Sequence, residues 1–346
     1  MITYQSNPQK NLYERNIALE VDGAYHKFNK HKKMDLKELR YRQSWTLDQK
    51  IYHSLEVIDT FYQRLNGKCY VSFSGGKDST IVLWLARKIY PNIKGCFCNT
   101  GNEYPDIVKF VRTFDNIDWI RPKLKPKEVL AKYGFPLVSK QISGLANIGK
   151  NHKNTKRGGQ VLGLTNDSKF RHKISEKYRY LCFDPYDVDN ICCTKLKKEP
   201  FHKYEKENNI SPILGTMAEE SNQRTTDYIK GGGCNIFSKG GKTKSIPLSI
   251  WLEKDVWECI EKYHIPISEI YRKGAKRTGC MFCGYGCQFK NDNRLQLVHD
   301  LYPKWYETFM NYTNNGVTYR EAMRKVLAVN GLSLPDENIQ LELDFE

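Results

Sequence analysis

Residues 70–86 read YVSFSGGKDSTIVLWLA and predict a short buried strand, a tight turn and a helix in immediate succession. Consecutive backbone N–H groups in such a turn form a nest for an anion, and the start of the helix adds about half a positive charge. Gly75 and Gly76 allow the backbone to approach a ligand closely, and Lys77 can reach phosphate oxygens. Asp78 or Ser79 can cap the helix. The stretch therefore predicts a phosphate-binding loop.

The chain around this loop alternates between strand-like and helical runs. Helices are expected at 80–90 and 104–114, and further helices before residue 65. The expected strands are 68–73, 92–100 and 117–122, and residues 211–221 read as another strand that enters a loop. Such alternation is typical of an α/β fold with a Rossmann-like, doubly wound parallel sheet.

Three consecutive segments are expected along the 346 residues, although one elaborated α/β domain would also suit this length. Residues 1–65 read as an N-terminal helical segment, 66–270 as the nucleotide-binding α/β domain, and 271–346 as a cysteine-rich and helical C-terminal region. Two stretches interrupt the α/β pattern. Residues 138–180 form a basic excursion with some helix, either flexible or ordered by a ligand, and 231–244 read as a glycine-rich surface loop.

The formal net charge of +16 favours a polyanionic partner, a nucleotide or a nucleic acid, over the alternative of solvated surface lysines. No apolar run approaches the roughly 20 residues of a membrane span, and residues 1–16 lack the apolar core of a signal peptide. We therefore expect a cytoplasmic protein without a membrane partner. The sequence indicates no oligomeric state.

The basic excursion combines cations with interleaved tyrosines, which suits contact with a phosphate backbone and stacking of bases; a solvated loop is the alternative. Its members are Lys150, Lys153, Lys156, Arg157, Lys169, Arg171, Lys173, Lys177 and Arg179, with Tyr178 and Tyr180.

Eleven cysteines in a chain without a signal peptide favour metal or redox chemistry over disulfides. Cys192 and Cys193 are adjacent, and Cys280 and Cys283 form a C-x-x-C pair that can reach one metal from a single turn. Structural zinc and buried, unligated thiols remain alternatives. Cys287 reads as a spare ligand, a sulfur-carrying thiol or a packed core residue.

The loop is not a Walker A motif, because Lys77 is followed by Asp78 and the required first glycine is missing. It matches the S-G-G-x-D-S motif and resembles the PP-loop ATP pyrophosphatases of the adenine nucleotide alpha-hydrolase (HUP) superfamily. The resemblance implies that an acceptor oxygen attacks the α-phosphate of ATP and releases pyrophosphate, with Mg²⁺ and Lys77 balancing the charge. Lys77 and Asp78 are then catalytic. The implied nucleotide contacts are Ser72, Ser74, Gly75, Gly76, Lys77, Asp78 and Ser79, with Thr100, Gly101 and Glu103 in a TG-x-E-x-P-like segment.

Residues 246–266 resemble a segment of the phosphoadenosine phosphosulfate (PAPS) reductase branch. The CC…C-x-x-C pattern resembles adenylylsulfate reductases, which implies that Cys192, Cys193, Cys280 and Cys283 hold a [4Fe–4S] cluster, with Zn²⁺ as the alternative. Lys197 and Pro200 match the residues that follow the family's tandem cysteines, but Leu196 replaces the usual arginine. The likeness further implies substrate contacts by Lys140, Lys197, Glu220 and Arg224.

Two departures bear on the activity. Sulfonucleotide reductases use a cysteine near the C-terminus, whereas no cysteine follows Cys287 here, so a reductase would need Cys287 or another thiol as its nucleophile. Lys77 and Asp78 are both present, as in family members that cleave ATP. The first hypothesis is therefore an ATP-dependent enzyme that adenylates a nucleic acid and transfers sulfur to it, partnered by a sulfur donor or reductant protein. Sulfonucleotide reduction and a non-catalytic nucleotide and cluster sensor are the alternatives.

Overall fold

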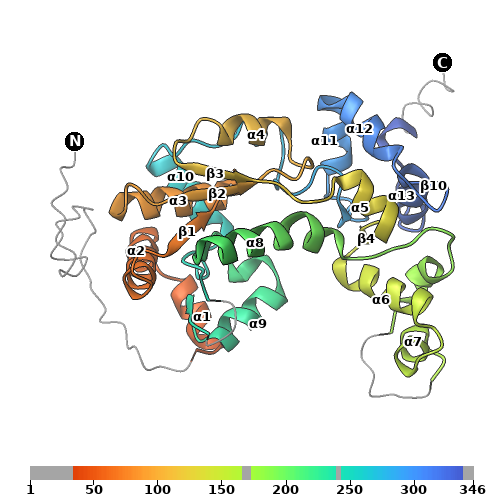
Figure 1. Ribbon diagram of the computed structural model, residues 1–346, viewed down its shortest axis with the longest axis horizontal. Coiled ribbons are helices and arrows are strands. Elements are labelled where there is room, and N and C mark those ends of the chain that lie inside the picture. Colours follow the sequence, from red (N-terminus) through yellow and green to blue (C-terminus); the bar gives the residue numbers. More distant parts are fainter. Residues whose placement is uncertain (1–33, 166–172, 239–242, 338–346) are drawn as a thin grey trace. The chain divides into compact units, whose positions relative to one another are not determined.

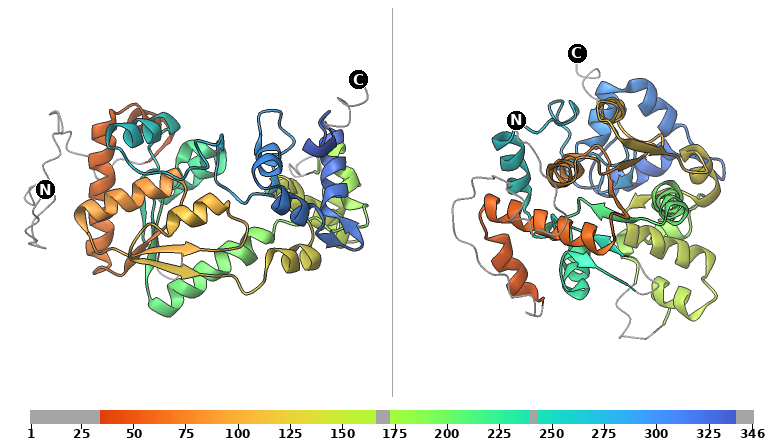
Figure 2. Two further views of the ribbon diagram at one scale, coloured as in Figure 1. Left: turned by 90° about the horizontal axis from the view of Figure 1, so that it is seen from above. Right: turned by 60° about the vertical axis from the view of Figure 1, so that its left-hand side comes forward.

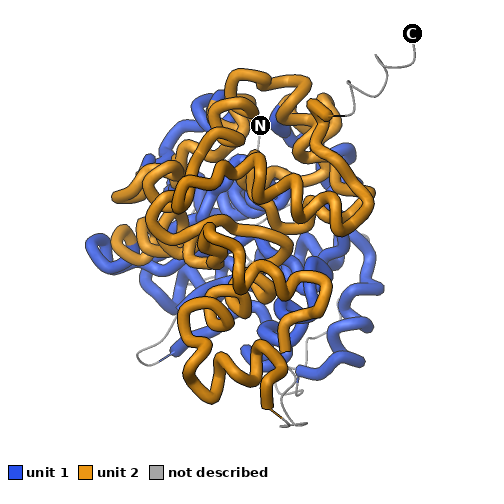
Figure 3. Tube along the Cα trace, turned by 90° about the vertical axis from the view of Figure 1, so that its right-hand side faces the viewer, with its two compact units in different colours: residues 1–97, 109–119, 205–268 blue, residues 98–108, 120–204, 269–346 orange. Residues whose placement is uncertain are grey.

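The computed structural model describes residues 34–165, 173–238 and 243–337. The chain forms two compact units, each assembled from segments that are far apart in the sequence (Figure 3). The first unit takes Met1–Phe97, Lys109–Trp119 and Glu205–Ser268, and the second takes Cys98–Val108, Ile120–Tyr204 and Glu269–Glu346. This grouping by contact differs from the three consecutive segments expected from the sequence, which stay a prediction.

The described part of the first unit is built on a six-stranded sheet in the order β3-β2-β1-β5-β7-β6 (Figure 1). Its strands are β1 (Cys69–Ser72), β2 (Gly95–Cys98), β3 (Ile117–Ile120), β5 (Ser211–Leu214), β6 (Asn235–Ile236) and β7 (Lys244–Ser245). Strand β1 pairs in parallel with β2 and β5, so that Ser72 lies opposite Cys96 and Leu214. Strand β5 is also parallel to β7, whereas β6 runs antiparallel to β7. The prediction of a parallel α/β sheet is confirmed.

The direction of winding reverses at β1. From β1 the chain moves outward to β2 and β3, and it later returns to place β5 on the other side of β1. Ligands of α/β proteins bind at the carboxyl ends of the strands beside such a switch point. The predicted phosphate loop begins where β1 ends.

Helices cover this sheet. Helix α3 packs on β1 and β5 as well as on helices α2 and α10. The hydroxyl of Tyr70 on β1 donates to Glu205 at 3.0 Å, which joins the strand to the C-terminal part of α8 (Glu199–Asn208). Figure 2 shows α3 and α8 flanking the strands from two sides. The helices of the first unit are α1 (Leu36–Gln43), α2 (Leu47–Arg64), α3 (Lys77–Ile89), α9 (Asn222–Gly231) and α10 (Glu253–Lys262).

A buried ion pair joins two of these helices. Lys50 on α2 is fully buried, and its Nζ lies 2.5 Å from Oδ2 of Asp255 on α10. The same carboxylate oxygen accepts the N–H of Leu252 at 2.6 Å, before the first turn of α10. The pair thus helps to hold α2, one of the N-terminal helices predicted from the sequence, against α10.

The second unit is mainly helical and contains two short strand pairs in its described part. Strand β4 (Leu137–Val138) pairs in parallel with β8 (Gly284–Tyr285), and β9 (Thr313–Asn314) forms a hairpin with β10 (Val317–Thr318). Its helices are α5 (Pro126–Tyr133), α6 (Lys140–Asn151), α7 (Lys156–Leu162), α11 (Arg294–Leu301), α12 (Pro303–Met310) and α13 (Tyr319–Ala328), with a 3₁₀ turn at Glu176–Cys182 and a π-helical turn at Thr194–Lys198. Helix α4 (Pro105–Val111) belongs partly to each unit.

The basic excursion contains the expected helix in its described residues, as α6, α7 and the 3₁₀ turn at Glu176–Cys182. The expectation of a surface loop at 231–244 needs correction, because this stretch supplies strand β6 and the start of β7 at the edge of the sheet. Its residues 239–242 lie outside the described residues. In the described part of the chain, no helix combines the length and the apolarity needed to cross a membrane.

Candidate functional site

The phosphate loop has the backbone that its glycines predict. Gly75 adopts φ +73°, a region in which a side chain is strained. The turn is braced by two serines. The N–H of Ser74 donates to Oγ of Ser79 at 3.1 Å, and the Ser79 hydroxyl donates to the carbonyl of Gly76 at 2.9 Å. Ser74 and Ser79 thus hold the loop in shape.

Helix α3 begins differently from the prediction. Its N-cap is Gly76, which makes no capping bond through a side chain, and Asp78 and Ser79 lie within the first turn. The expectation that Asp78 or Ser79 caps the helix is therefore wrong. No side chain takes the capping position, so the N–H groups at this end of α3 suit an anionic ligand.

Lys77 is almost buried, with 5% of the residue exposed. Its Nζ lies 3.0 Å from Asp78 Oδ1 and 3.3 Å from Glu253 Oε1, the first residue of α10, and 5.9 Å from the ring centre of Trp257. The ammonium is thus held at the N-terminal end of α3 by two carboxylates. An incoming polyphosphate would compete with these carboxylates for it.

Gly215 is a residue of this site that the sequence analysis missed. It follows β5, and a Cβ at this position would lie 2.9 Å from the carbonyl carbon of Asp78 and 2.9 Å from the nitrogen of Ser79. Real Cβ atoms do not approach so closely, so the loop after β5 can reach the start of α3 only with glycine. A glycine within 211–221, where the predicted strand enters a loop, was the available signal.

The proposed substrate residues Glu220 and Arg224 form an ion pair with each other. Glu220 also accepts the N–H of Met217 at 2.9 Å, and Arg224 is 39% exposed. Both follow Gly215 along the same loop and into α9. Their contact with a substrate stays a prediction.

The predicted nucleotide residues Thr100, Gly101 and Glu103 follow β2 and belong to the second unit. Gly101 adopts φ +81°. The carboxylate of Glu103 accepts the Thr100 N–H at 2.9 Å and the Thr100 hydroxyl at 2.7 Å. It also lies 3.9 Å from Nζ of Lys197. This network connects the segment to the cysteine region, while its contact with a nucleotide stays a prediction.

The structure brings the four predicted ligand cysteines together in the second unit, around a cavity of about 20 Å³. Cys192 and Cys193 directly precede the π-helical turn, which carries Lys197. Cys280 and Cys283 lie on the turn that ends in β8. π-Helical turns are frequent at functional sites. The cavity is lined by Cys192, Cys193, Cys280 and Cys283 with Asn102, Pro136, Leu196, Lys197, Phe282 and Tyr285.

Burial governs the ionisation of three of these thiols. It raises the pKa of Cys192 and of Cys280, and it raises the pKa of Cys283 to about 11. The positive charge of Lys197 opposes this rise at Cys280, and the negative charge of the Cys280 thiolate in turn raises the pKa of Lys197. These three thiols are therefore mainly neutral near pH 7, and Lys197 favours ionisation of Cys280.

The donor set suits a metal–sulfur group in type and number, because four thiols from two distant segments meet beside a cation. As the side chains stand, however, no group of three or more His, Cys, Asp or Glu residues in the described ranges is arranged to hold a metal ion. The cavity has the size of about one water molecule. A metal centre here would require the thiols to turn towards a common point.

The turn that carries Cys280 and Cys283 is fastened by the C-terminal helices. The Tyr319 hydroxyl on α13 donates to the carbonyl of Phe282 at 2.7 Å. The Arg294 guanidinium on α11 donates to the carbonyls of Cys283 and Tyr285 at 2.8 and 3.0 Å. These two side chains, which the sequence analysis did not single out, fix the backbone around Cys283.

Cys287 lies beside this turn and is 4% exposed. Its Sγ donates to the carbonyl of Cys283 at 3.2 Å, and burial raises its pKa to about 12. Cys287 is therefore a buried thiol whose raised pKa favours the protonated form, and a role for it in sulfur chemistry stays a prediction.

Asn102 is a further residue that the sequence analysis missed. It is 1% exposed, and its carbonyl accepts the N–H of Met281, between the cysteines of the C-x-x-C pair, at 2.8 Å. Its side chain lines the thiol cavity, and its Oδ1 finds no hydrogen-bond partner within the described residues. A polar residue inside the TG-x-E-x-P-like segment was the available signal.

Some of the basic residues predicted to contact a substrate or nucleic acid are exposed, whereas others are bonded within the protein. Lys140 is exposed at the start of α6. Lys150 is engaged internally, because its Nζ donates to the carbonyls of Asp184 and Tyr186 at 2.9 and 2.8 Å and pairs with Asp187 at 2.9 Å. Lys150 therefore supports the fold. The remaining described cations of the excursion stay predicted contacts, and Lys169 and Arg171 lie outside the described residues.

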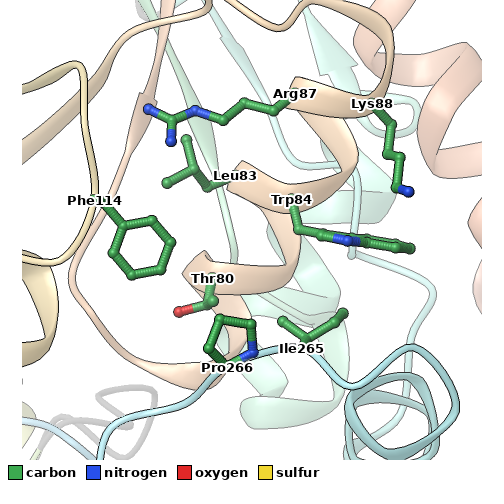
Figure 4. A pocket seen from close by; sticks show the side chains of 8 residues that line it. All are labelled: Thr80, Leu83, Trp84, Arg87, Lys88, Phe114, Ile265 and Pro266. Atoms are coloured by element: carbon green, nitrogen blue, oxygen red, sulfur yellow. The ribbon is translucent and has the colours of Figure 1, made fainter. Parts of the chain in front are cut away.

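A second pocket, of about 340 Å³, lies along α3 in the first unit (Figure 4). Two of its polar groups are engaged within the protein: the Thr80 hydroxyl donates to the Gly76 carbonyl at 3.0 Å, and an Arg87 Nη donates to the Asp115 carbonyl at 2.6 Å. We assign it no role. It is lined by Thr80, Leu83, Trp84, Arg87, Lys88, Phe114, Ile265 and Pro266.

Known proteins resemble this chain across both units. The family model described as "Phosphoadenosine phosphosulfate reductase domain" matches residues 68–139 and 160–285, more than half of the chain. The chain therefore belongs to the PAPS reductase domain family.

Individual relatives are distant. An uncharacterized protein of Methanocaldococcus jannaschii is 26% identical over 272 residues, covering 75% of this chain and 52% of the relative. This chain thus spans about half the length of that archaeal protein. An adenosine 5'-phosphosulfate reductase of Lysinibacillus sphaericus is 22% identical over 243 residues, covering 69% of this chain and 83% of the relative.

Among solved structures, the phosphate complex of a PAPS reductase from Candida auris aligns with a TM-score of 0.40 and 15% sequence identity. The alignment covers 72% of this chain and 97% of that one. The fold assignment rests on the strand order and pairing described above.

Proposed function

We propose that this protein is an enzyme that cleaves ATP between the α and β phosphates, adenylates an acceptor on a nucleic acid and supports transfer of sulfur to it. The observation that carries the proposal is the placement of Lys77. A buried ammonium, paired with Asp78, stands at the start of α3 directly after the switch-point strand β1. Binding alone would tolerate loss of either residue better than bond cleavage would.

The phosphate loop would bind the polyphosphate through the N–H groups of the turn and of the first turn of α3. Lys77 would leave its carboxylate partners for the phosphate oxygens and stabilise the charge that develops on pyrophosphate. Asp78, whose side chain is 27% exposed, offers the oxygen donors that Mg²⁺ prefers and would hold the ion that accompanies ATP. That ion supplies further neutralisation of phosphate charge.

The bonds balance in two steps. An acceptor oxygen forms a bond to the α-phosphorus, the bond from that phosphorus to the bridging oxygen breaks, and pyrophosphate leaves with the electron pair. A sulfur nucleophile at the oxidation level of hydrosulfide then displaces AMP, which carries away the former acceptor oxygen. The second step is an exchange without net oxidation, and its sulfur must come from a donor.

The thiol pocket supports the sulfur part of this proposal. Cys192, Cys193, Cys280 and Cys283 would hold a [4Fe–4S] cluster, or zinc as the alternative, beside Lys197. Such a group, when bound, supplies sulfur coordination or redox chemistry. Lys197 would balance the negative charge of the thiolates, and Arg294 and Tyr319 would keep the C-x-x-C turn in place.

Sulfonucleotide reduction is the second candidate. It is favoured by the relatives named adenosine 5'-phosphosulfate reductase, including the protein from Lysinibacillus sphaericus. The same phosphate loop would then bind the nucleotide without cleaving ATP. Cys287 does not favour this candidate, because a buried thiol whose pKa is raised to about 12 is a poor nucleophile.

The deciding experiment measures products from ATP under anaerobic conditions, with single-stranded DNA or tRNA as acceptor. We expect pyrophosphate release, and we expect Lys77→Ala to reduce it by roughly 100-fold through loss of charge stabilisation. Lys88→Ala, near the other end of the same helix, is the matched control and should retain activity. Mass analysis of the nucleic acid should show sulfur once a donor is added.

Other outcomes select the other candidates. Sulfite released from PAPS or adenylylsulfate with a thiol donor, without pyrophosphate from ATP, would establish the reductase. ATP binding without either product would indicate a nucleotide sensor.

A further inference from the structure

The segment around the C-x-x-C turn is unusually basic. Residues 272–290 contain five Lys and Arg residues and no Asp or Glu. Two of the five have carboxylate partners: Arg272 pairs with Glu269 at 2.7 Å, and Lys273 pairs with Asp106 at 2.8 Å. Exposed Lys276, Arg277 and Lys290 remain, and the structure gives none of them an ion pair within the described residues.

The two ends of this segment are fastened together. Lys276 Nζ donates to the carbonyl of Asn291 at 3.1 Å, and Asn293 Nδ2 donates to the carbonyl of Gly274 at 3.0 Å. The cations before the cysteines and Lys290 after them therefore belong to one surface of the second unit, rather than to separate loops.

An aromatic ring stands on the same surface. Phe289 is 60% exposed, so its ring is available for stacking. It follows a turn in which its N–H donates to the Gly286 carbonyl at 3.1 Å. Its nearest ring carbon lies 4.0 Å from the site of a Cβ on Gly286, so the ring lies against the glycine turn and leaves much of its surface open.

We propose that the surface formed by Lys276, Arg277, Phe289 and Lys290, here the basic–aromatic face, binds single-stranded nucleic acid. A base would stack on Phe289, and the flanking phosphates would pair with Arg277 and Lys290. An acidic protein would use the cations but would not require an aromatic ring. The face deepens the proposed function, on which it rests, because it lies on the segment that carries Cys280 and Cys283 and would hold the acceptor strand beside the thiol pocket.

The test measures fluorescence anisotropy of a labelled 20-nucleotide single strand with the full chain, without ATP and over a range of salt concentrations. We expect Phe289→Ala to weaken binding by roughly tenfold, and Phe289→Tyr to restore it to within about twofold, because a phenol ring stacks as well. Arg277→Ala and Lys290→Ala should each reduce the log–log salt slope by about 0.7. The control is Lys304→Ala, which replaces an exposed lysine on α12 and should leave the salt slope unchanged.

The outcomes separate this proposal from the proposed function. Tight, salt-dependent binding that is unaffected by all three alanine variants would overturn the basic–aromatic face and leave the acceptor class intact. No binding of single strands by the wild-type chain, with pyrophosphate still released from ATP, would overturn both the face and a nucleic-acid acceptor. Equal loss in Phe289→Ala and Phe289→Tyr would overturn stacking; circular dichroism of each variant checks that it is folded.

Discussion

Buried ionisable side chains in this protein either have an oppositely charged partner or are kept neutral by burial. Lys50 and Lys77 have carboxylates within 2.5 and 3.0 Å, so their charges are compensated. His53 on α2 has a different environment. It is 8% exposed, its Nε2 lies 3.7 Å from Cys234 Sγ, and the ring of Trp45 meets it edge-on. Burial, assisted by the positive charge of Arg42, lowers the pKa of His53 from 6.5 to about 3.

This depressed pKa makes the protein sensitive to acid. Below pH 6.5 the unfolded chain gains a proton at His53, whereas the folded chain stays neutral there until about pH 3. The free energy of unfolding should therefore fall as the pH falls through this window, by up to roughly 5 kcal/mol from this group. His53→Gln should flatten that part of the curve in chemical unfolding measured at several pH values.

The matched control is His202→Gln, which changes an exposed histidine on α8. It should keep the acid dependence of the wild type. Parallel curves for His53→Gln and the wild type between pH 6.5 and 3 would contradict the assignment.

At the scale of elements, two loops approach each other closely at the proposed phosphate site. Strand β1 delivers the turn and α3 receives it, while the loop after β5 comes against the first turn of α3 at Gly215. A contact between two backbones leaves no flexible side chain to move aside. The geometry of the proposed nucleotide site should therefore depend on Gly215 more than the stability of the sheet does.

We expect Gly215→Ala to reduce pyrophosphate release at least tenfold, because the added Cβ would lie 2.9 Å from the backbone of Asp78 and Ser79 and must displace the loop. Gly279→Ala is the steric control, since a Cβ there meets nothing within 4 Å. Activity and thermal unfolding are measured on both variants. Wild-type activity in Gly215→Ala would contradict the prediction, because the loop would then accommodate a Cβ at this position.

At the scale of the whole molecule, the two parts of the proposed chemistry belong to different compact units. The phosphate loop belongs to the first unit, whereas the thiol pocket, Lys197 and the basic–aromatic face belong to the second. The cysteines outside the pocket are buried in the protein core. Cys98, for example, is 6% exposed, and its thiol donates to the Leu196 carbonyl at 3.4 Å. Metal binding should therefore depend on the four pocket cysteines alone.

We expect protein purified anaerobically to be brown and to contain iron and acid-labile sulfide, and Cys280→Ser to lose most of both. Serine oxygen is a poor substitute for a thiolate towards iron. Cys259→Ser, at a buried position on α10, should retain the metal. Both variants are compared by metal analysis and visible absorption.

A colourless, zinc-containing protein would replace the iron–sulfur proposal with the zinc alternative. If neither the wild type nor Cys280→Ser contained iron or zinc, both the iron–sulfur proposal and the zinc alternative would be contradicted.

The sequence by itself determined the elements whose signals are local. The β1–turn–α3 unit, the helices before residue 65 and the parallel sheet follow from apolar periodicity and glycine placement over short windows. Local patterns could also indicate which cysteines to group, because C-x-x-C and adjacent cysteines are short motifs. The local pattern was misleading at Asp78 and Ser79, which were expected to cap the helix. The Ser79 hydroxyl instead hydrogen-bonds to the turn, at the Ser74 N–H and the Gly76 carbonyl.

Only the tertiary structure decided which distant groups meet. It engaged Lys150 with carbonyls near residue 185, connected Glu103 to Lys197, and brought the ends of the basic segment together. These contacts join separate segments of the chain through ion pairs and backbone carbonyls, which no short sequence pattern records. The same reason explains why the contributions of Gly215, Asn102, Arg294 and Tyr319 became visible only in the folded chain: each acts through the backbone of another segment.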